Sequence, residues 1–274
     1  MKVNQIDISK DMKVSDLVAQ FEASDVLGAG RVARATNILA NMIKDEDTNV
    51  FMSLGGPLIP GGMRNIVSQM IREGHVDLIV SSGANLTHDL LEAFGGAHYR
   101  DEGKDDEELN AEGIGRIADI NVGSNDFEVF EKEINRLFEI ISAKKPVISI
   151  QELIYEIGML IDDENSFIAT AARNNVPIFA PGIIDCMIGL QLWIFSQDHD
   201  FTISAALASN ILNGGLDCAV QITMDRPEAG SLGGAPLEEA KSWSKAKCGS
   251  NLATVVGDVT IIFPLIYAAA LDKI

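Results

Sequence analysis

Blocks of hydrophobic side chains at helical and then strand-like spacing run along this chain. Residues 14–44 show helical spacing, and Gly28-Ala29-Gly30 divides them into two expected helices. The next block predicts a strand at 48–54, a loop rich in glycine and proline, and a helix at 63–74. A continuous apolar run at 76–82 follows, which is typical of a buried parallel strand.

The order strand, loop, helix then repeats, because Gly83-Ala84-Asn85 leads from this run into a second apolar helix. Two such units in succession predict an α/β fold, a doubly wound, mostly parallel sheet flanked by helices (Rossmann-like). Ligands of such sheets bind beyond the carboxyl ends of the strands, where Ser81, Ser82 and Gly83 would lie. We expect residues 1–274 to form a single domain with an N-terminal helical segment at about 1–47.

The remaining segments alternate in the same way. An acidic, polar stretch at 99–113 predicts a solvated surface excursion, and 127–142 predicts a core-facing helix. In chain order we further expect helices at 149–161 and 166–175, strands at 176–182 and 216–223, and at 257–274 a strand with Asp258 at its start followed by a terminal helix.

The charge of the chain limits its partners. A net charge of -19, from 40 acidic and 21 basic residues, argues against nucleic acid, whose binding needs a basic surface. A polycationic ligand or a basic partner fits better, although acidity can also serve solubility alone.

The cysteines and the apolar runs point to a cytoplasmic protein. Three cysteines without CxxC spacing suggest neither disulfides nor a metal site, and free thiols suit a reducing cytosol. The N-terminus has no apolar signal core, and no apolar run reaches the roughly 20 residues that a membrane span needs. We therefore expect a soluble, cytoplasmic protein that does not contact a membrane.

Two glycine-containing stretches are candidates for phosphate binding. Residues 28–33 match the dinucleotide fingerprint formally, but a helix precedes them where the fingerprint requires a strand. Gly55 and Gly56 follow an expected strand and lead toward a helix, where bare backbone amides can approach a phosphate closely. A tight turn without a ligand is equally compatible with that geometry.

Lys245 is the candidate nucleophile. A lysine amine reacts only where burial or neighbouring charge lowers its pKa, and Trp243 offers an apolar wall two residues away. Glu238 and Glu239 offer carboxylates for a cationic substrate. The spacing alone is more typical of a solvated lysine beside glutamates than of a nucleophile.

Six stretches together give a family resemblance. The chain resembles the deoxyhypusine synthases, whose S-W-x-K lysine is the covalent nucleophile, and the similarity covers most of its length in the same order. The stretches are FMSLGGPLIPGGMR (51–64), VDLIVSSGANLTHDLLEAFG (76–95), VPIFAPGIID (176–185), GLDCAVQIT (215–223), GSLGGAPLEEAKSWSKAK (230–247) and GDVTIIFPL (257–265).

The resemblance implies a reaction in which NAD oxidises spermidine and a lysine captures the aminobutyl group as an imine. A lysine of translation initiation factor 5A then receives the group, and the hydride stored on the cofactor reduces the product. It also implies a homotetramer with sites between subunits. By this resemblance Lys245 is the nucleophile. The residues implied for substrate are Gly230, Ser231, Glu239 and Trp243, and those implied for NAD are Gly55, Gly56, Ser82, Gly83, Asp185 and Asp258. No metal is implied.

The chain departs from the family pattern in several places. Leu190 stands where the best-known members have a substrate-binding aspartate, and His88 where many have an acidic residue. A segment of roughly 30 residues with a Gly-Gly-Gly loop and a Lys-His pair is missing between 200–207 and 208–220. Either the sequence omits these residues, which the high folding cost of losing a central strand favours, or the chain is a shortened paralogue with impaired catalysis.

Three functions therefore stay open. The first is deoxyhypusine synthesis. The second is a related polyamine transfer that makes homospermidine or uses agmatine, toward which Leu190 and the motif SSGANLTHDL lean. The third is a catalytically impaired, NAD-binding subunit that stabilises an active paralogue.

Overall fold

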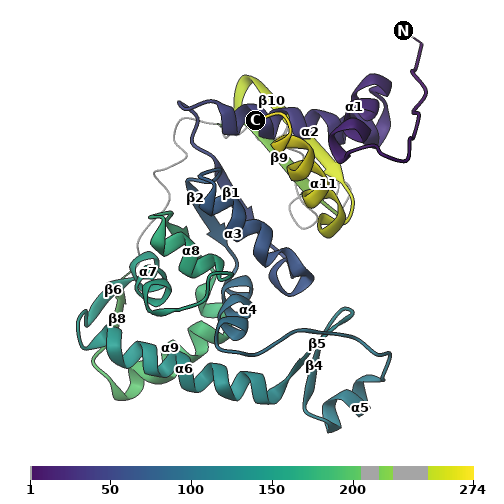
Figure 1. The fold of residues 1–274 in the computed structure, drawn as a ribbon. Coiled ribbons are helices and arrows are strands. Elements are labelled where there is room, and N and C mark those ends of the chain that lie inside the picture. The colour runs from purple at the N-terminus through teal and green to yellow at the C-terminus, as the bar shows by residue number, and fades with distance from the viewer. Residues whose placement is uncertain (1, 205–215, 225–245) are drawn as a thin grey trace. The chain divides into compact units, whose positions relative to one another are not determined.

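The computed structural model describes residues 2–204, 216–224 and 246–274. These residues form two compact units, Met1–Asn49 with Ala208–Ile274, and Val50–Leu207. Figure 1 shows the elements of each unit, which we describe separately. Mixed helices and parallel strands confirm the α/β class.

In its described residues, the first unit contains three helices and a parallel strand pair. Helices α1 (Val14–Ser24), α2 (Leu27–Lys44) and α11 (Val259–Leu271) pack with strands β9 (Leu216–Thr223) and β10 (Ala246–Val256). The core residues come from all three helices and from β10, and they are Val18, Val32, Ala33, Ala35, Ile38, Ala253, Val255, Ile266 and Ala269.

The break between the first two helices lies earlier than the sequence predicts. Asp25 ends α1 in the left-handed conformation (φ 45°), and Gly28 and Gly30 lie within the first turns of α2. A Cβ on Gly30 would lie 2.9 Å from the backbone carbon of Asp25, which is closer than side-chain carbons normally come. Gly30 therefore permits the tight corner between the helices and does not interrupt one.

The expected strand at the start of 257–274 is wrong. Asp258 is the N-cap of α11, and its Oδ1 accepts a hydrogen bond from the amide of Thr260 at 2.9 Å. The β-branched run from Val259 to Ile262 thus begins a helix that contains Pro264, and the strand lies upstream as β10. A cap that satisfies orphan amides, together with burial against the unit core, overrides the weak strand preference of the run.

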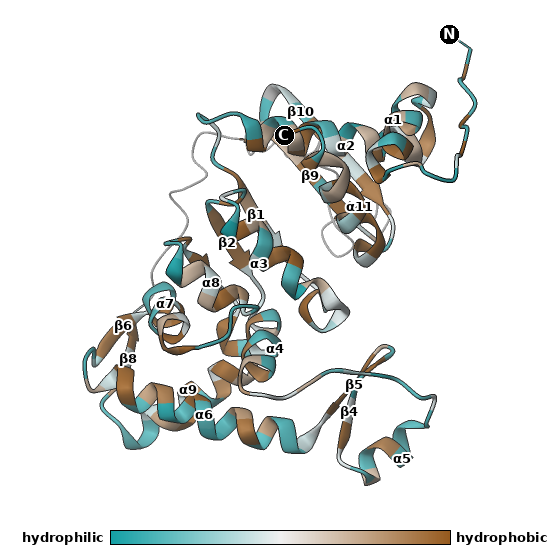
Figure 2. Cartoon of the chain, in the orientation of Figure 1, coloured by the Kyte–Doolittle hydropathy of each residue, from teal (hydrophilic) through white to brown (hydrophobic). Residues whose placement is uncertain are grey.

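The second unit is organised by a three-stranded parallel sheet in the order β1, β2, β7. Strand β1 (Phe51–Leu54) leads through a π-helical turn η1 (Ile59–Met63) and helix α3 (Arg64–Arg72) to β2 (Leu78–Ser81). Helix α4 (Gly83–Ala93) follows β2, and β7 (Ile178–Phe179) pairs with β2 in parallel register. Figure 2 shows the hydrophobic character of β1 and β2 that the apolar runs predict.

Helices and a second parallel pair complete this unit. Strands β6 (Val147–Ser149) and β8 (Thr202–Ser204) pair in parallel. The helices are α6 (Ser124–Ser142), α7 (Ile150–Leu160), α8 (Phe167–Arg173), the 3-10 turn η2 (Ile183–Asp185) and α9 (Met187–Asp198). Helix α6 buries Phe130, Ile134 and Phe138, which confirms its predicted core-facing side, and its banding is visible in Figure 2.

The acidic excursion is largely exposed, as expected, but it also has regular structure. Strand β3 (Tyr99–Arg100) and helix α5 (Asp106–Ala111) lie within it. Strands β4 (Ile114–Ile117) and β5 (Ile120–Gly123) complete an antiparallel sheet in the order β3, β5, β4. The sequence analysis missed this sheet.

Candidate active site

The carboxyl ends of β1, β2 and β7 gather most of the predicted cofactor residues. Gly55 and Gly56 follow β1, Ser82 and Gly83 follow β2, and Asp185 ends η2 beyond β7. The amide of Ser82 donates to the carbonyl oxygen of Leu54 at 3.1 Å, so the first two strand ends meet directly. The edge of the parallel sheet thus places these residues together, as the repeated order of strand, loop and helix in the sequence predicts.

Asn85 ties the glycine loop to the start of α4. Its side chain is fully buried, and its Nδ2 donates to the carbonyl oxygen of Gly56 at 3.0 Å and to Ser82 Oγ at 3.2 Å. Its Oδ1 accepts from the amide of Ile59 at 3.1 Å. The sequence alone indicated no role for Asn85. A polar side chain in the first turn of a helix that follows a buried strand was the available signal.

Gly83 allows α4 to begin directly against the segment that carries Asp185. A Cβ on Gly83 would lie 2.5 Å from Cys186 Sγ and 2.8 Å from Cys186 Cβ, distances that no real side chain adopts. In contrast, a Cβ on Gly55 or Gly56 would meet nothing within 4 Å. Gly83 is therefore needed for packing, while Gly55 and Gly56 leave their backbone open to a ligand.

A cavity of about 520 Å³ adjoins this edge. Residues of α4, α6, η2 and α9 line it, and they are Ala84, Thr87, His88, Phe127, Ile184, Asp185, Cys186, Met187 and Leu190. Thr87 is 3% exposed, and its Oγ1 has no hydrogen-bond partner among the described residues. Leu190, at the position where the family resemblance implies a substrate-binding aspartate, lies in the wall of this cavity.

His88 begins a row of polar contacts that leads away from the cavity. His88 Nδ1 lies 2.8 Å from His98 Nε2, and His98 Nδ1 lies 2.7 Å from Glu92 Oε1. Burial, and secondarily the neighbouring His98, lowers the pKa of His88 to about 4, so its ring is neutral at pH 7. The sequence analysis gave His88 no firm role and did not consider His98.

A buried ion pair holds α4 in place on its other side. Arg64 Nε donates to Asp89 Oδ1 at 2.6 Å, and Arg64 Nη2 donates to Asp163 Oδ2 at 2.7 Å. Burial lowers the pKa of Arg64, but Asp89 and Asp163 more than offset this effect, and the pKa is raised. Arg64 Nη1 also lies 3.6 Å from Glu92 Oε2, which links the pair to the histidine row.

Asp258 belongs to the other unit and caps α11. Its carboxylate accepts from both the amide and the hydroxyl of Thr260, and this lowers the pKa of Asp258. Its predicted role in cofactor binding stays a prediction.

The predicted nucleophile and its neighbours lie outside the described residues. These are Gly230, Ser231, Glu238, Glu239, Trp243 and Lys245. Their roles stay predictions from the sequence.

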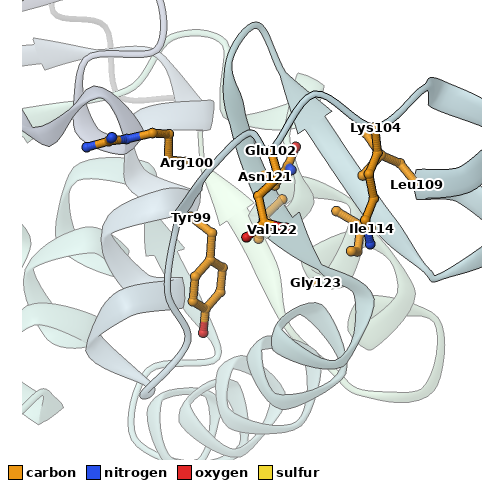
Figure 3. Close-up of a pocket in the computed structure, with 9 residues that line it drawn as sticks. All are labelled: Tyr99, Arg100, Glu102, Lys104, Leu109, Ile114, Asn121, Val122 and Gly123. Atoms are coloured by element: carbon orange, nitrogen blue, oxygen red, sulfur yellow. The ribbon is translucent and has the colours of Figure 1, made fainter.

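A smaller cavity of about 250 Å³ lies against the antiparallel sheet, and Figure 3 shows the side chains around it, among them Tyr99, Lys104 and Asn121. Asn121 Nδ2 donates to Asp101 at 3.2 Å, while its Oδ1 has no partner within the described part of the chain. None of the predicted site residues that the structure describes lines this cavity.

Of the helices that the structure describes, none has both the length and the apolar character that crossing a bilayer requires.

Comparison with known proteins points in one direction. A family model for deoxyhypusine synthase matches residues 16–207 and 200–270. A probable deoxyhypusine synthase of Methanothermobacter thermautotrophicus is 52% identical over 304 aligned positions that cover 100% of this chain and 99% of that protein. One from Methanopyrus kandleri is 38% identical over 294 positions, covering 96% of each.

A solved structure shows the same overall fold. A crystal structure of a candidate deoxyhypusine synthase from Entamoeba histolytica aligns with a TM-score of 0.64 at 16% identity. It covers 99% of this chain and 97% of that one.

Proposed function

The chain belongs to the deoxyhypusine synthase family, and on that premise we propose that it transfers the aminobutyl group of spermidine to a lysine of translation initiation factor 5A. The gathering of Gly55, Gly56, Ser82, Gly83 and Asp185 at one sheet edge, beside a cavity lined by α4, α6, η2 and α9, carries this proposal. A translation factor as acceptor places the reaction in the cytoplasm.

The described residues fit NAD as the cofactor. The open backbone at Gly55 and Gly56 and the first amides of α4 suit the pyrophosphate, and Asp185 suits a ribose hydroxyl. Asp258 would add a further contact. When bound, NAD would take a hydride from the polyamine and leave an electrophilic carbon. The doubly wound arrangement of the whole sheet is part of this proposal, as is a homotetramer with sites shared between subunits.

Lys245 would then act as the nucleophile in its neutral form. Trp243 would supply the apolar wall that lowers its pKa, and Glu239 would hold an ammonium end of the substrate. Gly230 and Ser231 would line the polyamine pocket. These assignments rest on the sequence motif alone.

An impaired, NAD-binding paralogue is the second candidate, and it applies if the missing segment is absent from the protein itself. The 304 positions aligned with the M. thermautotrophicus protein exceed the 274 residues of this chain by about 30. The two parts of the family match overlap at 200–207, directly before the position where the missing segment is expected. Transfer to a small amine, with homospermidine as product or agmatine as substrate, is the remaining enzymatic alternative, and Leu190 in the cavity wall favours it.

One experiment separates these functions. Intact mass spectrometry of the purified protein first determines whether the 30 residues are present. The protein is then incubated with NAD, spermidine and purified factor 5A, and the masses of the factor and of the small amines are measured. A gain of an aminobutyl group on the factor supports the synthase, a new polyamine supports the small-molecule transferase, and neither product supports the impaired subunit.

The nucleophile is tested by comparing two lysines of the same segment. Lys245→Ala should reduce transfer to background. Lys247→Ala is the matched control, because Lys247 Nζ lies 2.7 Å from Asp217 Oδ2 and that ion pair gives it another role. Undiminished transfer by the Lys245 variant would refute the assignment.

A further inference from the structure

Two backbone groups fix the orientation of the Asn85 side chain, because each can play only one part in a hydrogen bond. The amide of Ile59 can only donate, and it lies 3.1 Å from Asn85 Oδ1. The carbonyl oxygen of Gly56 can only accept, and it lies 3.0 Å from Asn85 Nδ2. Exchanging the oxygen and nitrogen of the Asn85 amide would place donor against donor and acceptor against acceptor, so the orientation is unique.

This orientation determines the role of the Ser82 hydroxyl. Asn85 Nδ2 has two protons to donate, of which one goes to Gly56 and the other reaches Ser82 Oγ at 3.2 Å. The backbone amide of Asn85 approaches the same oxygen at 3.5 Å. Ser82 Oγ is therefore an acceptor toward Asn85, and its own proton has no acceptor among the residues that the structure describes.

The neighbouring serine differs in this respect. Ser81 is 3% exposed, and its Oγ donates to the carbonyl oxygen of Ser82 at 3.0 Å. Ser82 is only half-buried, and its amide bonds to Leu54, directly before the open backbone of Gly55. Of these two serines, Ser82 is thus the one whose hydroxyl proton is available to a bound molecule.

We propose that Asn85 is a positioning residue for the cofactor, which holds the Ser82 hydroxyl as a donor toward an oxygen of bound NAD. Asn85 is fully buried and acts through Ser82 and through the loop at Gly56. The inference rests on the proposed function, since NAD is the cofactor of that reaction and its phosphate oxygens only accept hydrogen bonds. A donor that is oriented before the cofactor arrives costs less to order on binding.

The role of Ser82 is measured by calorimetric titration with NAD in the absence of a polyamine. Ser82→Ala should bind NAD roughly 10- to 100-fold more weakly, as expected for one hydrogen bond to a charged group. Ser82→Thr keeps a hydroxyl and should restore most of the affinity. Ser81→Ala is the matched control, because the Ser81 hydroxyl is already engaged within the protein, and its affinity for NAD should stay within about twofold of the wild type.

The role of Asn85 is tested by a double-mutant cycle. Asn85→Asp keeps an oxygen for the amide of Ile59 but has no proton to donate, because a carboxylate only accepts. The Ser82 proton should then turn toward the new carboxylate and be lost to NAD. Adding Ser82→Ala should therefore weaken NAD binding by less than about threefold in this background, against 10- to 100-fold in the wild type. Comparing the two factors removes any other effect of the Asn85 substitution.

The outcomes distinguish this inference from the proposed function. An equal loss from Ser82→Ala in both backgrounds would overturn the inference, and so would wild-type NAD affinity in Ser82→Ala. The proposed function would survive either result if the wild type transfers the aminobutyl group. The expected coupling without any transfer would support the inference and count against the proposed function. Circular dichroism establishes that each variant is folded, and Asn85→Ala, which also removes the donor to Ser82, takes the place of Asn85→Asp if the latter is not.

Discussion

Replacing Asp89 by alanine should strongly destabilise the unit that carries the candidate site. The carboxylate of Asp89 is fully buried and accepts from Arg64 Nε at 2.6 Å and Ser166 Oγ at 2.6 Å. It also accepts from the amides of Phe167 and Ile168, both at 3.2 Å, at the start of α8. One substitution therefore removes the acceptor of four donors, one from α3 and three from the start of α8.

The expected loss of stability follows from which groups stay buried without a partner. Breaking a buried ion pair by removing one partner costs about 3–5 kcal/mol, and losing the acceptor at a helix start costs about 1 kcal/mol. Arg64 keeps Asp163, 2.7 Å away, so the lower part of this range applies. We expect a loss of about 3–4 kcal/mol, which lowers the melting temperature by roughly 6–15 °C in a protein of this size.

The assay is urea and thermal unfolding at pH 7, followed by circular dichroism. Asp163→Ala is the matched control, because the Asp163 side chain is 21% exposed, and it should cost only about 1 kcal/mol. Combining Asp89→Leu with Arg64→Met should cost less than the two single changes together, since no buried charge is left unpaired. An Asp89→Ala protein within about 1 kcal/mol of the wild type would show that the pair does not hold α4.

Three further predictions concern the same unit. His88 has a folded pKa of about 4 against 6.5 in the unfolded chain, so only the unfolded chain takes up this proton as pH falls from 6.5 to 4. The wild type should therefore lose about 1–2 kcal/mol of unfolding free energy across this window, after allowance for the partial exposure of His88. Unfolding measured at pH 7 and at pH 4.5 should show a smaller difference for His88→Gln than for the wild type. Gly83→Ala should lower the free energy of unfolding by about 1–3 kcal/mol, because the new Cβ meets Cys186. The control Gly28→Ala lies in open space in α2 and should raise the free energy of unfolding by about 0.5–1 kcal/mol. Equal unfolding midpoints for the two variants would contradict this packing. Asn85→Ala should lower the free energy of unfolding by about 1–3 kcal/mol and weaken NAD binding measured by calorimetry. An unchanged NAD affinity would show that Asn85 does not hold the glycine loop for cofactor binding.

The sheet edge could be predicted from the sequence because each part of it has a local cause. Apolar runs bounded by glycine give β1 and β2, and a parallel sheet necessarily places their carboxyl ends together. The positions of Gly55, Gly56, Ser82 and Gly83 follow from this without any knowledge of distant contacts.

The antiparallel sheet and the histidine row could not be predicted in this way. Strand β3 has two residues, and its pairing of Tyr99 with Asn121 joins positions far apart in sequence. His98 reaches His88 because the chain turns back at Gly95, whose φ of 95° no periodic pattern indicates. Both features depend on contacts that form only once the chain has folded.

Helix α4 shows why polar residues of a site can be misread from periodicity. Ser82, Asn85, Asp89 and Glu92 recur at spacings of three, four and three, which would ordinarily mark the solvated face of a helix. Asn85 and Asp89 are fully buried, and so are Leu86 and Leu90 on the adjoining side of the helix. Buried polar groups on such a stripe must be satisfied internally, and here Asn85 and Asp89 are satisfied through the glycine loop, α8 and Arg64. The stripe therefore fixes the position of Thr87 and His88 between its members, and the geometry of the cavity depends on residues that do not line it.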